Sequence, residues 1–252
     1  MSWISRASVD GHDALMLELR NLVKHYQVGD AEPVRAVDGV SLSIAAGELV
    51  ALYGPSGSGK TTLLMLIAAL IDPDAGAVLV AGRDLSGLTD AERSHYRLRE
   101  LGFVDQTSDL LPGGNVVQNA AMKLWLLEHT RDAEHRIEPL LVRLGLGDRL
   151  AHRADQLSTG ERQRVMIARA LSTDPKLVLA DEPTGSLDTH RSREILQLLM
   201  EVCRERDAAV LLVTHDPQAT AFADRVYALR DGRLLDYESD HLFAARAPET
   251  AR

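Results

Sequence analysis

A glycine-rich loop between two apolar segments constrains the fold of this chain more than any other feature. The segment GPSGSGKT, at residues 54–61, fits the pattern G-x-x-x-x-G-K-[ST]. It follows a predicted buried strand at 48–53 and precedes a predicted helix at 62–70. A turn of this kind presents successive backbone N–H groups, and the positive end of a helix dipole, to an anion. A surface loop rich in Gly and Ser is the alternative, but it would not explain the flanking strand and helix.

The residue types in this loop suit the binding of phosphate. Gly57 and Gly59 permit the close backbone approach and the unusual φ that a side chain would block. The Lys60 amine can reach the β- and γ-phosphates of a nucleotide, and the Thr61 hydroxyl can hold Mg²⁺. The predicted phosphate-binding residues are Gly54, Pro55, Ser56, Gly57, Ser58, Gly59, Lys60, Thr61 and Thr62.

Composition and charge disfavour several other functions. The chain has 252 residues, of which 45% are hydrophobic, and its formal net charge of −9 disfavours a nucleic acid bound by bulk electrostatics. A single cysteine, Cys203, cannot form an internal disulfide, and we expect it to be a buried, inert thiol. No apolar run approaches the roughly 18 residues of a membrane span. Residues 1–14 lack the apolar centre of a signal peptide and predict a disordered lead-in, and 239–252 predict a loose tail.

Hydrophobic periodicity predicts an α/β fold. Residues 15–26 alternate as a strand, and strands at 40–44 and 48–53 around an Ala46-Gly47 turn predict a small antiparallel sheet near the N-terminus. Residues 115–144 have helical spacing and predict an all-helical insertion. Further elements are predicted along the chain: a strand at 77–81, a helix at 160–171, a strand at 177–180, a helix at 189–206, a strand at 209–214, and a hairpin around Asp231-Gly232. Strands separated by helices imply parallel crossovers.

Two carboxylates end the apolar strand at 177–180. In open α/β sheets ligands bind at the carboxyl edge, where Asp181 and Glu182 would lie. Asp181 suits Mg²⁺, and Glu182 suits the polarisation of an attacking water. Alone, such acids are as often a helix cap or part of a turn, but together with the phosphate loop they favour a nucleotide site.

A second anion site is predicted at the start of the helix at 160–171. Ser158 can cap this helix, and the first-turn N–H groups are free to meet an anion. Because one nucleotide per chain does not need two such sites, the simplest explanation is that this one faces the nucleotide of another chain. Taken alone, Ser158 and Glu161 would be an ordinary capping box.

The order of these motifs resembles the ATP-binding-cassette (ABC) ATPases, over about residues 15–238. Besides the phosphate loop and the acidic strand end, LSTGERQRV at 157–165 resembles the family signature. Other family motifs match Tyr26 in VKHY, Gln106 in FVDQ, Ser186-Leu187-Asp188 as the D-loop, and His215 in VTHD. The resemblance implies a P-loop NTPase core, a mostly parallel sheet with flanking helices. An N-terminal antiparallel β-subdomain and an α-helical subdomain inserted at about 107–160 would complete it.

The resemblance implies ATP and Mg²⁺ as cofactors and gives roles to particular residues. Glu182 and His215 would be catalytic, and Tyr26 would stack on adenine, although without the family a Tyr that packs on the sheet is favoured. Gln106 would sense Mg²⁺ and the γ-phosphate. The expected metal-binding residues are Thr61, Gln106 and Asp181. The remaining expected nucleotide-binding residues are Ser158, Thr159, Gly160, Glu161 and Asp188.

Two residues depart from the family pattern. Thr159 replaces the usual Gly of the signature and adds a β-branched side chain near the partner's γ-phosphate. Asp105 stands where an apolar residue is common, and we expect it to be solvated beside a transmembrane interface rather than near Mg²⁺. Residues 110–119 resemble the lipoprotein-releasing, macrolide-exporting and cell-division cassettes, with Gln118 in place of Glu and Asn115 in place of Thr.

The resemblance implies a nucleotide-driven clamp. Two copies, or two closely related cassettes, would close head to tail over two ATP molecules, and hydrolysis would open them. The chain would dock on a separate membrane permease, at the cytoplasmic face of the membrane, through a groove between the Q-loop and the helical lobe. It would power export or transmit force.

Two other functions remain as alternatives. The same ATPase could regulate a cell-envelope hydrolase through a membrane partner without moving a solute. A soluble cassette that acts on ribosomes or DNA is disfavoured by the single cassette, the absence of a heptad run and the acidic balance. A GTPase is disfavoured because no N-K-x-D motif is present.

Overall fold

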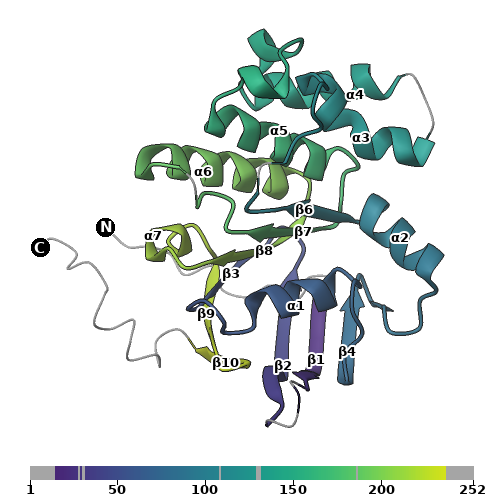
Figure 1. The fold of residues 1–252 in the computed structure, drawn as a ribbon, viewed down its shortest axis with the longest axis vertical. Coiled ribbons are helices and arrows are strands. Elements are labelled where there is room, and N and C mark those ends of the chain that lie inside the picture. Colours follow the sequence, from purple (N-terminus) through teal and green to yellow (C-terminus); the bar gives the residue numbers. More distant parts are fainter. Residues whose placement is uncertain are drawn as a thin grey trace, which may run out of the picture.

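Two β-sheets enclose helix α1 (Lys60–Ile67) in the computed structural model (Figure 1). The structure describes residues 15–27, 29, 32–107, 109–128, 132–185 and 187–236. The expected lead-in at 1–14, the expected tail at 239–252 and Ser186 of the D-loop lie outside the described residues. The buried side chains of α1 belong to a core that includes residues of both sheets.

The larger sheet is mainly parallel and has the strand order β10-β9-β3-β8-β7-β6. Its strands are β3 (Leu49–Tyr53), β6 (Leu101–Val104), β7 (Leu177–Asp181), β8 (Ala209–Thr214), β9 (Arg225–Arg230) and β10 (Arg233–Asp236). The predicted hairpin is confirmed, since β9 and β10 pair antiparallel around Asp231 and Gly232, which both have positive φ. All other neighbours in this sheet are parallel.

The smaller sheet is antiparallel and has the order β2-β1-β4-β5. Its strands are β1 (Leu15–Tyr26), β2 (Val34–Ala45), β4 (Ala75–Val80) and β5 (Arg83–Asp84). The expectation that residues 48–53 also belong here is wrong, because β3 pairs parallel with β8 and β9. Four of the five β3 residues are buried, and such continuous burial is typical of a parallel strand covered on both faces.

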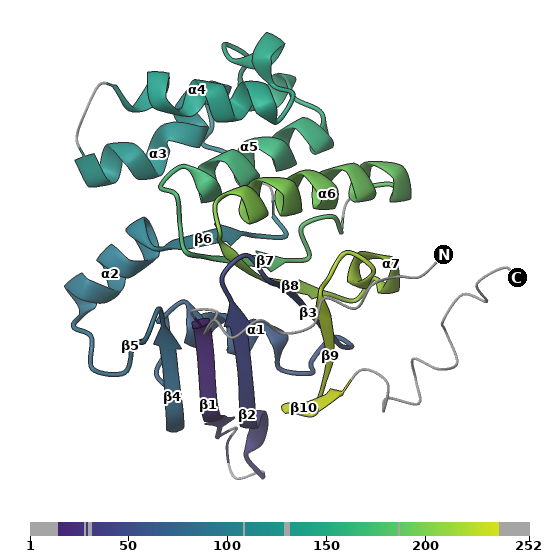
Figure 2. The same cartoon turned by 180° about the vertical axis from the view of Figure 1, so that it is seen from behind.

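Helices cover both faces of the parallel sheet, as Figure 2 shows from behind. Along β7, Leu177 and Leu179 share a core with α1, whereas Val178 and Ala180 share one with α5 (Thr159–Leu171) and α6 (Thr189–Glu205). Beyond α5 lie α3 (Val116–Glu128) and α4 (Ala133–Arg143), followed by the short turns η1 (Gly147–Arg149) and η2 (Ala154–Gln156). The sequence did not predict α2 (Asp90–Arg99), β5, β6 or α7 (Pro217–Thr220).

Cys203 is buried in α6, as expected. Burial raises the pKa of its thiol to about 12, so the reactive thiolate is scarce at neutral pH. Over the described part of the chain, no helix combines the length and the apolar character that a membrane span requires.

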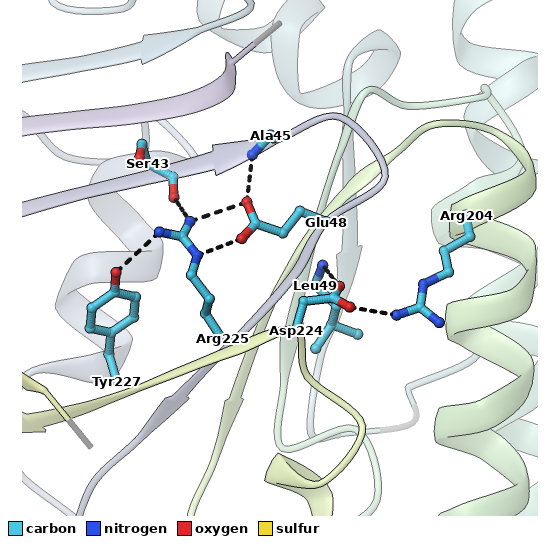
Figure 3. A network of polar contacts seen from close by, with 8 residues as sticks. All are labelled: Ser43, Ala45, Glu48, Leu49, Arg204, Asp224, Arg225 and Tyr227. Carbon is cyan, nitrogen blue, oxygen red and sulfur yellow. Dashed lines mark hydrogen bonds and ion pairs between the residues drawn. The ribbon is translucent and has the colours of Figure 1, made fainter. Parts of the chain in front are cut away.

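An ionic network fastens the start of β9 to the turn before β3 (Figure 3). The Arg225 guanidinium donates to both carboxylate oxygens of Glu48 and to the carbonyl of Ser43. Asp224, which directly precedes Arg225 in the chain, accepts hydrogen bonds from Leu49 N at 2.9 Å and from Arg204 Nη2 at 2.7 Å. The network therefore joins the end of the antiparallel sheet, the parallel sheet and α6.

Replacing Arg225 by Met should lower the free energy of unfolding by about 1–2 kcal/mol, because two charge-assisted bonds to Glu48 are lost. Nucleotide affinity should be unchanged, since Arg225 begins its strand and the phosphate loop lies beyond the other end of β3. Urea unfolding measures the free energy of unfolding of R225M. R230M is the control, because the exposed Arg230 guanidinium lies 3.9 Å from Asp231 and outside the network. Equal stability of the two variants would show that the network contributes nothing.

Candidate active site

A cavity of about 790 Å³ lies at the carboxyl edge of the parallel sheet. The segments that follow β3, β6, β7 and β8 line it, together with the end of β1 and the start of β2. The predicted site residues that line it are Tyr26, Pro55, Ser56, Gly57, Gly59, Lys60, Thr61, Thr62, Gln106, Asp181, Glu182 and His215. Gly54 and Ser58 belong to the same loop and are buried beneath this surface.

The phosphate loop is held by close backbone contacts that only glycine allows. Gly59 caps α1 with φ of 105°, and a Cβ atom there would lie 1.9 Å from the Ala36 carbonyl oxygen of β2. A Cβ on Gly54 would lie 2.4 Å from the Leu229 carbonyl oxygen of β9. The loop is therefore wedged between the two sheets, with the N-terminus of α1 directed at the cavity.

Lys60 bends back over its own loop. Its Nζ donates to the carbonyl oxygens of Gly54 at 2.7 Å and Pro55 at 2.8 Å. Burial lowers the pKa of this amine, and the charges of Glu182 and Asp181 oppose that shift. A phosphate would offer the amine an anionic partner in place of two neutral carbonyls, which fits a nucleotide better than an empty surface loop.

Glu182 and His215 are brought into direct contact from neighbouring strands. Glu182 follows β7 with φ of 48°, and its N–H donates to the carbonyl of Val213 in β8 at 2.9 Å. Its Oε1 lies 2.6 Å from His215 Nδ1. The Glu182 side chain is 12% exposed and the His215 ring is 64% exposed, so the ring is free to rotate away from the carboxylate.

Asp181 has the environment of a group that needs a cation. Burial raises its pKa, and the carboxylates of Glu182 and Asp105 raise it further, while Lys60 opposes them. Within the described ranges, His, Cys, Asp and Glu form no group of three or more that could hold a metal by themselves. Thr61, Gln106 and Asp181 line one cavity, and this oxygen set fits Mg²⁺, which takes one or two carboxylates plus substrate phosphates.

Tyr26 is the last residue of β1 and also lines the cavity. Its side chain is exposed, and Lys24 Nζ lies 5.8 Å from the ring centroid. Four further residues line the cavity without having been predicted, namely Val34, Arg35, Ala36 and Tyr53. Val34, Arg35 and Ala36 belong to no motif and reach the cavity only because β2 pairs with β1. Tyr53 directly precedes the phosphate loop, and this position in the sequence could have indicated that it lines the cavity.

The signature residues are not among those lining this cavity. Ser158 caps α5 and forms the predicted capping box: its N–H and Oγ both donate to Glu161 Oε2 at 2.8 Å, and Glu161 N donates back to Ser158 Oγ. Thr159 and Gly160 form the first turn. Asp188 is also outside the cavity and caps α6, accepting from Arg191 N at 3.0 Å. The phosphate loop and the start of α5 are therefore separate features of the described residues.

Comparison with known proteins identifies the family. A family model described as "ABC transporter" matches residues 37–185. The chain is 47% identical to "Lipoprotein-releasing system ATP-binding protein LolD 2" of Caulobacter vibrioides, covering 87% of this chain and 96% of that protein. It is 44% identical to "Macrolide export ATP-binding/permease protein MacB" of Rhodopirellula baltica, over 88% of this chain and 33% of that protein.

Solved structures give the same result. The "Dimeric Structure of MJ0796, a Bacterial ABC Transporter Cassette" matches with a TM-score of 0.79 and 35% identity, covering 88% of this chain and 98% of that one. A post-hydrolysis dimer of the same cassette, bound to ADP and Pi, matches with a TM-score of 0.78. The chain belongs to the ABC transporter family, and it has the fold of an ABC cassette. The expected similarity to lipoprotein-releasing and macrolide-exporting members is confirmed.

Glu161 gives a pH-dependent contribution to stability. Its hydrogen bonds from the Ser158 backbone and side chain, and then Arg149, lower the pKa of its carboxyl from 4.5 to about 2. Because the folded pKa is the lower one, this stabilisation is present above about pH 4.5 and is lost as the pH falls towards 2. Glu161→Gln should therefore lower the unfolding midpoint at pH 7, and the gap from wild type should narrow below pH 4.5.

Urea midpoints measured from pH 7 down to the onset of acid unfolding test this. Glu201→Gln is the matched control, since that exposed acid accepts only from Gln197 among the contacts described. A gap that is constant with pH would contradict the assignment of the stabilisation to the ionised capping box.

Proposed function

We propose that this chain is the ATP-hydrolysing subunit of a membrane ABC transporter, and that two copies close head to tail over two ATP molecules. One observation carries the proposal: the phosphate-loop cavity and the N-terminus of α5 are separate features of one chain, and each is of a kind that suits an anion. In a head-to-tail pair, the phosphate-loop cavity of each copy would face the N-terminus of α5 of the other copy. A cassette that matches this chain was solved as a dimer, which supports the pairing of two copies.

Binding would begin at the phosphate loop. The N–H groups of the first turn of α1 would take the β-phosphate, and Lys60 would leave the Gly54 and Pro55 carbonyls for the γ-phosphate. Tyr26 would stack on the base with the face of its ring that Lys24 does not occupy. Mg²⁺, held by Thr61, Asp181 and Gln106, would neutralise charge on the phosphate oxygens.

Hydrolysis would need Glu182 to orient a water in line with the γ-phosphate. In the structure its Oε1 is bound to His215, so the ring must turn to the γ-phosphate before both groups can act. Ser158, Thr159 and Gly160 of the opposite copy would then bind the γ-phosphate from the other side, and Asp188 would lie at the same junction. Loss of the γ-phosphoryl group would remove the shared ligand and open the pair.

The transporter also needs a membrane subunit. Relatives at 44–47% identity include an ATP-binding protein of a lipoprotein-releasing system and a fused ATP-binding and permease protein. We therefore place the chain at the cytoplasmic face of the membrane, held there by a separate permease that exports a substrate or transmits force. A scaffold that moves no solute is not favoured by these relatives.

Lys60→Ala should weaken ATP binding by about 10- to 100-fold, because a charge-assisted bond to the phosphates is lost. Isothermal titration with ATP and Mg²⁺ measures the affinity. Lys176→Ala, which removes an exposed lysine outside the cavity, is the matched control and should bind like wild type. Unchanged affinity in K60A would overturn the assignment of the phosphate loop.

Glu182→Gln should reduce ATP hydrolysis by about 100-fold or more while ATP binding is retained, since only the water-orienting carboxylate is lost. The variant should accumulate as an ATP-bound dimer, detected by light scattering at saturating ATP.

A second substitution makes this test specific for the α5 surface. Gly160→Asp fits the fold, since a Cβ there meets nothing nearer than 4.0 Å, and its charge would repel the opposite γ-phosphate. E182Q/G160D should stay monomeric, whereas E182Q/G87D, with the same change at another open glycine, should dimerise. A monomeric E182Q, or a dimer that survives G160D, would contradict the head-to-tail clamp.

A further inference from the structure

Asp105 directly follows β6, and the pairing of β6 with β7 places it beside Asp181. The two strands are parallel, and Val104 at the end of β6 is paired with Ala180. One residue further along each chain segment, Asp105 and Asp181 are therefore level with each other, on strands whose backbones lie roughly 4.8 Å apart. The sequence favoured a solvated Asp105 away from Mg²⁺, whereas this register brings it next to a residue expected to bind the metal.

The two acids also continue the same face of the parallel sheet. Leu179 of β7 belongs to the core that contains the buried side chains of α1, and its partner in β6 is Phe103. Because side chains alternate between the faces of a strand, Asp181 and Asp105, each two residues further on, lie on the α1 side of the sheet. Helix α1 begins at the phosphate loop. Both carboxylates are therefore on the side where the nucleotide phosphates would bind.

The charge of Asp105 reaches Asp181. Burial raises the pKa of Asp181, the charge of Glu182 raises it further, and the charge of Asp105 adds to these two effects. The Asp105 side chain is partly buried, and it is oriented by a hydrogen bond that Thr107 Oγ1 donates to its Oδ2 at 3.2 Å. A cation held at Asp181 would relieve the repulsion between these carboxylates, and it would gain from each of them.

Asp105 does not line the active-site cavity, and this limits the kind of contact that it can make. Asp181 and Gln106 line that cavity, whereas Asp105 lines a groove at the outer edge of the sheet. Mg²⁺ keeps several of its waters when it binds to carboxylates and phosphates. A carboxylate just outside the ligands can accept hydrogen bonds from such waters, and loss of partners of this kind weakens metal binding by about 10- to 100-fold.

We propose that Asp105 is a positioning residue for Mg²⁺, which accepts a hydrogen bond from a metal-bound water and adds a negative charge beside Asp181. The metal would then bind more tightly to the chain with its nucleotide. The inference rests on the proposed function, because it concerns the metal that accompanies ATP. The apolar residue that is common at this position in ABC cassettes could make neither contribution.

Nucleotide binding without turnover tests this role. The affinity for a non-hydrolysable ATP analogue is measured by isothermal titration, once with Mg²⁺ and once with EDTA, and the ratio of the two affinities gives the effect of the metal. Asp105→Asn should lower this ratio by about tenfold. Its affinity in EDTA should equal or exceed that of wild type, because one negative charge near the phosphates is removed. Asp105→Glu keeps the charge and should retain most of the ratio.

Asp109→Asn is the matched control. Asp109 lies in the same loop and lines the same groove as Asp105. Burial lowers the pKa of Arg169, and the charge of Asp109 opposes this more than that of Asp105 does. Of the two acids, however, it is Asp105 whose charge acts on Asp181. D109N should therefore keep the wild-type ratio, and this separates an effect on the metal from an effect on the groove.

The outcomes distinguish this inference from the proposed function. A wild-type chain that binds no analogue in either condition contradicts the proposed function. If wild type binds the analogue more tightly with Mg²⁺, three results would overturn only the role of Asp105. These are a wild-type ratio in D105N, an equal decrease in D109N, and a D105N affinity that falls as much in EDTA as with Mg²⁺, which indicates a structural defect.

Discussion

The close packing of the phosphate loop between two sheets is the constraint on which the rest of the structure depends. Gly59 touches the backbone of β2 and Gly54 touches the backbone of β9, at distances that exclude any Cβ atom. The antiparallel sheet therefore contributes directly to the site, because one of its strands packs against the phosphate loop. With both walls in place the N–H groups at the start of α1 are fixed before any anion arrives, so little conformational entropy is lost on binding.

The carboxyl edge of the parallel sheet determines which side chains of the candidate active site meet. Parallel strands β7 and β8 end side by side, and this brings Glu182 and His215 into contact although 33 residues separate them in the chain. Helix α5 starts elsewhere and keeps its capping box outside the cavity. In the proposed head-to-tail pair, the start of α5 would complete the cavity of the other copy, and a matching cassette was solved as a dimer.

Much of the fold could be predicted from the sequence, because several of its segments have a local sequence pattern of their own. The apolar runs of β7 and β8, the phosphate loop and the Asp-Gly hairpin each carry their own signal. Helix α2 was missed because it is polar and buries only Tyr96, although Thr89 and Glu92 form a capping box that marks its start. Strand β6 has four residues and depends on β7 for its hydrogen bonds.

The residues of the candidate site also fall into two groups, those that local sequence motifs indicate and those that only the structure places. Gln106, Asp181, Glu182 and His215 line the same cavity as the phosphate loop, whereas Arg35 and Ala36 reach it through the pairing of β2 with β1, which no local pattern encodes. Side chains placed by strand pairing or helix packing need the structure.

The placement of β3 has a consequence for biosynthesis. This strand, encoded near residue 50, has as its two neighbours β8 and β9, encoded after residue 208, and Glu48 meets Arg225 across 177 positions. Such non-local pairings form late, because a long segment must be closed before they contribute. In a nascent chain on the ribosome, β2 is therefore made before the phosphate loop, whereas the wall that β9 forms is added only when the last strands emerge.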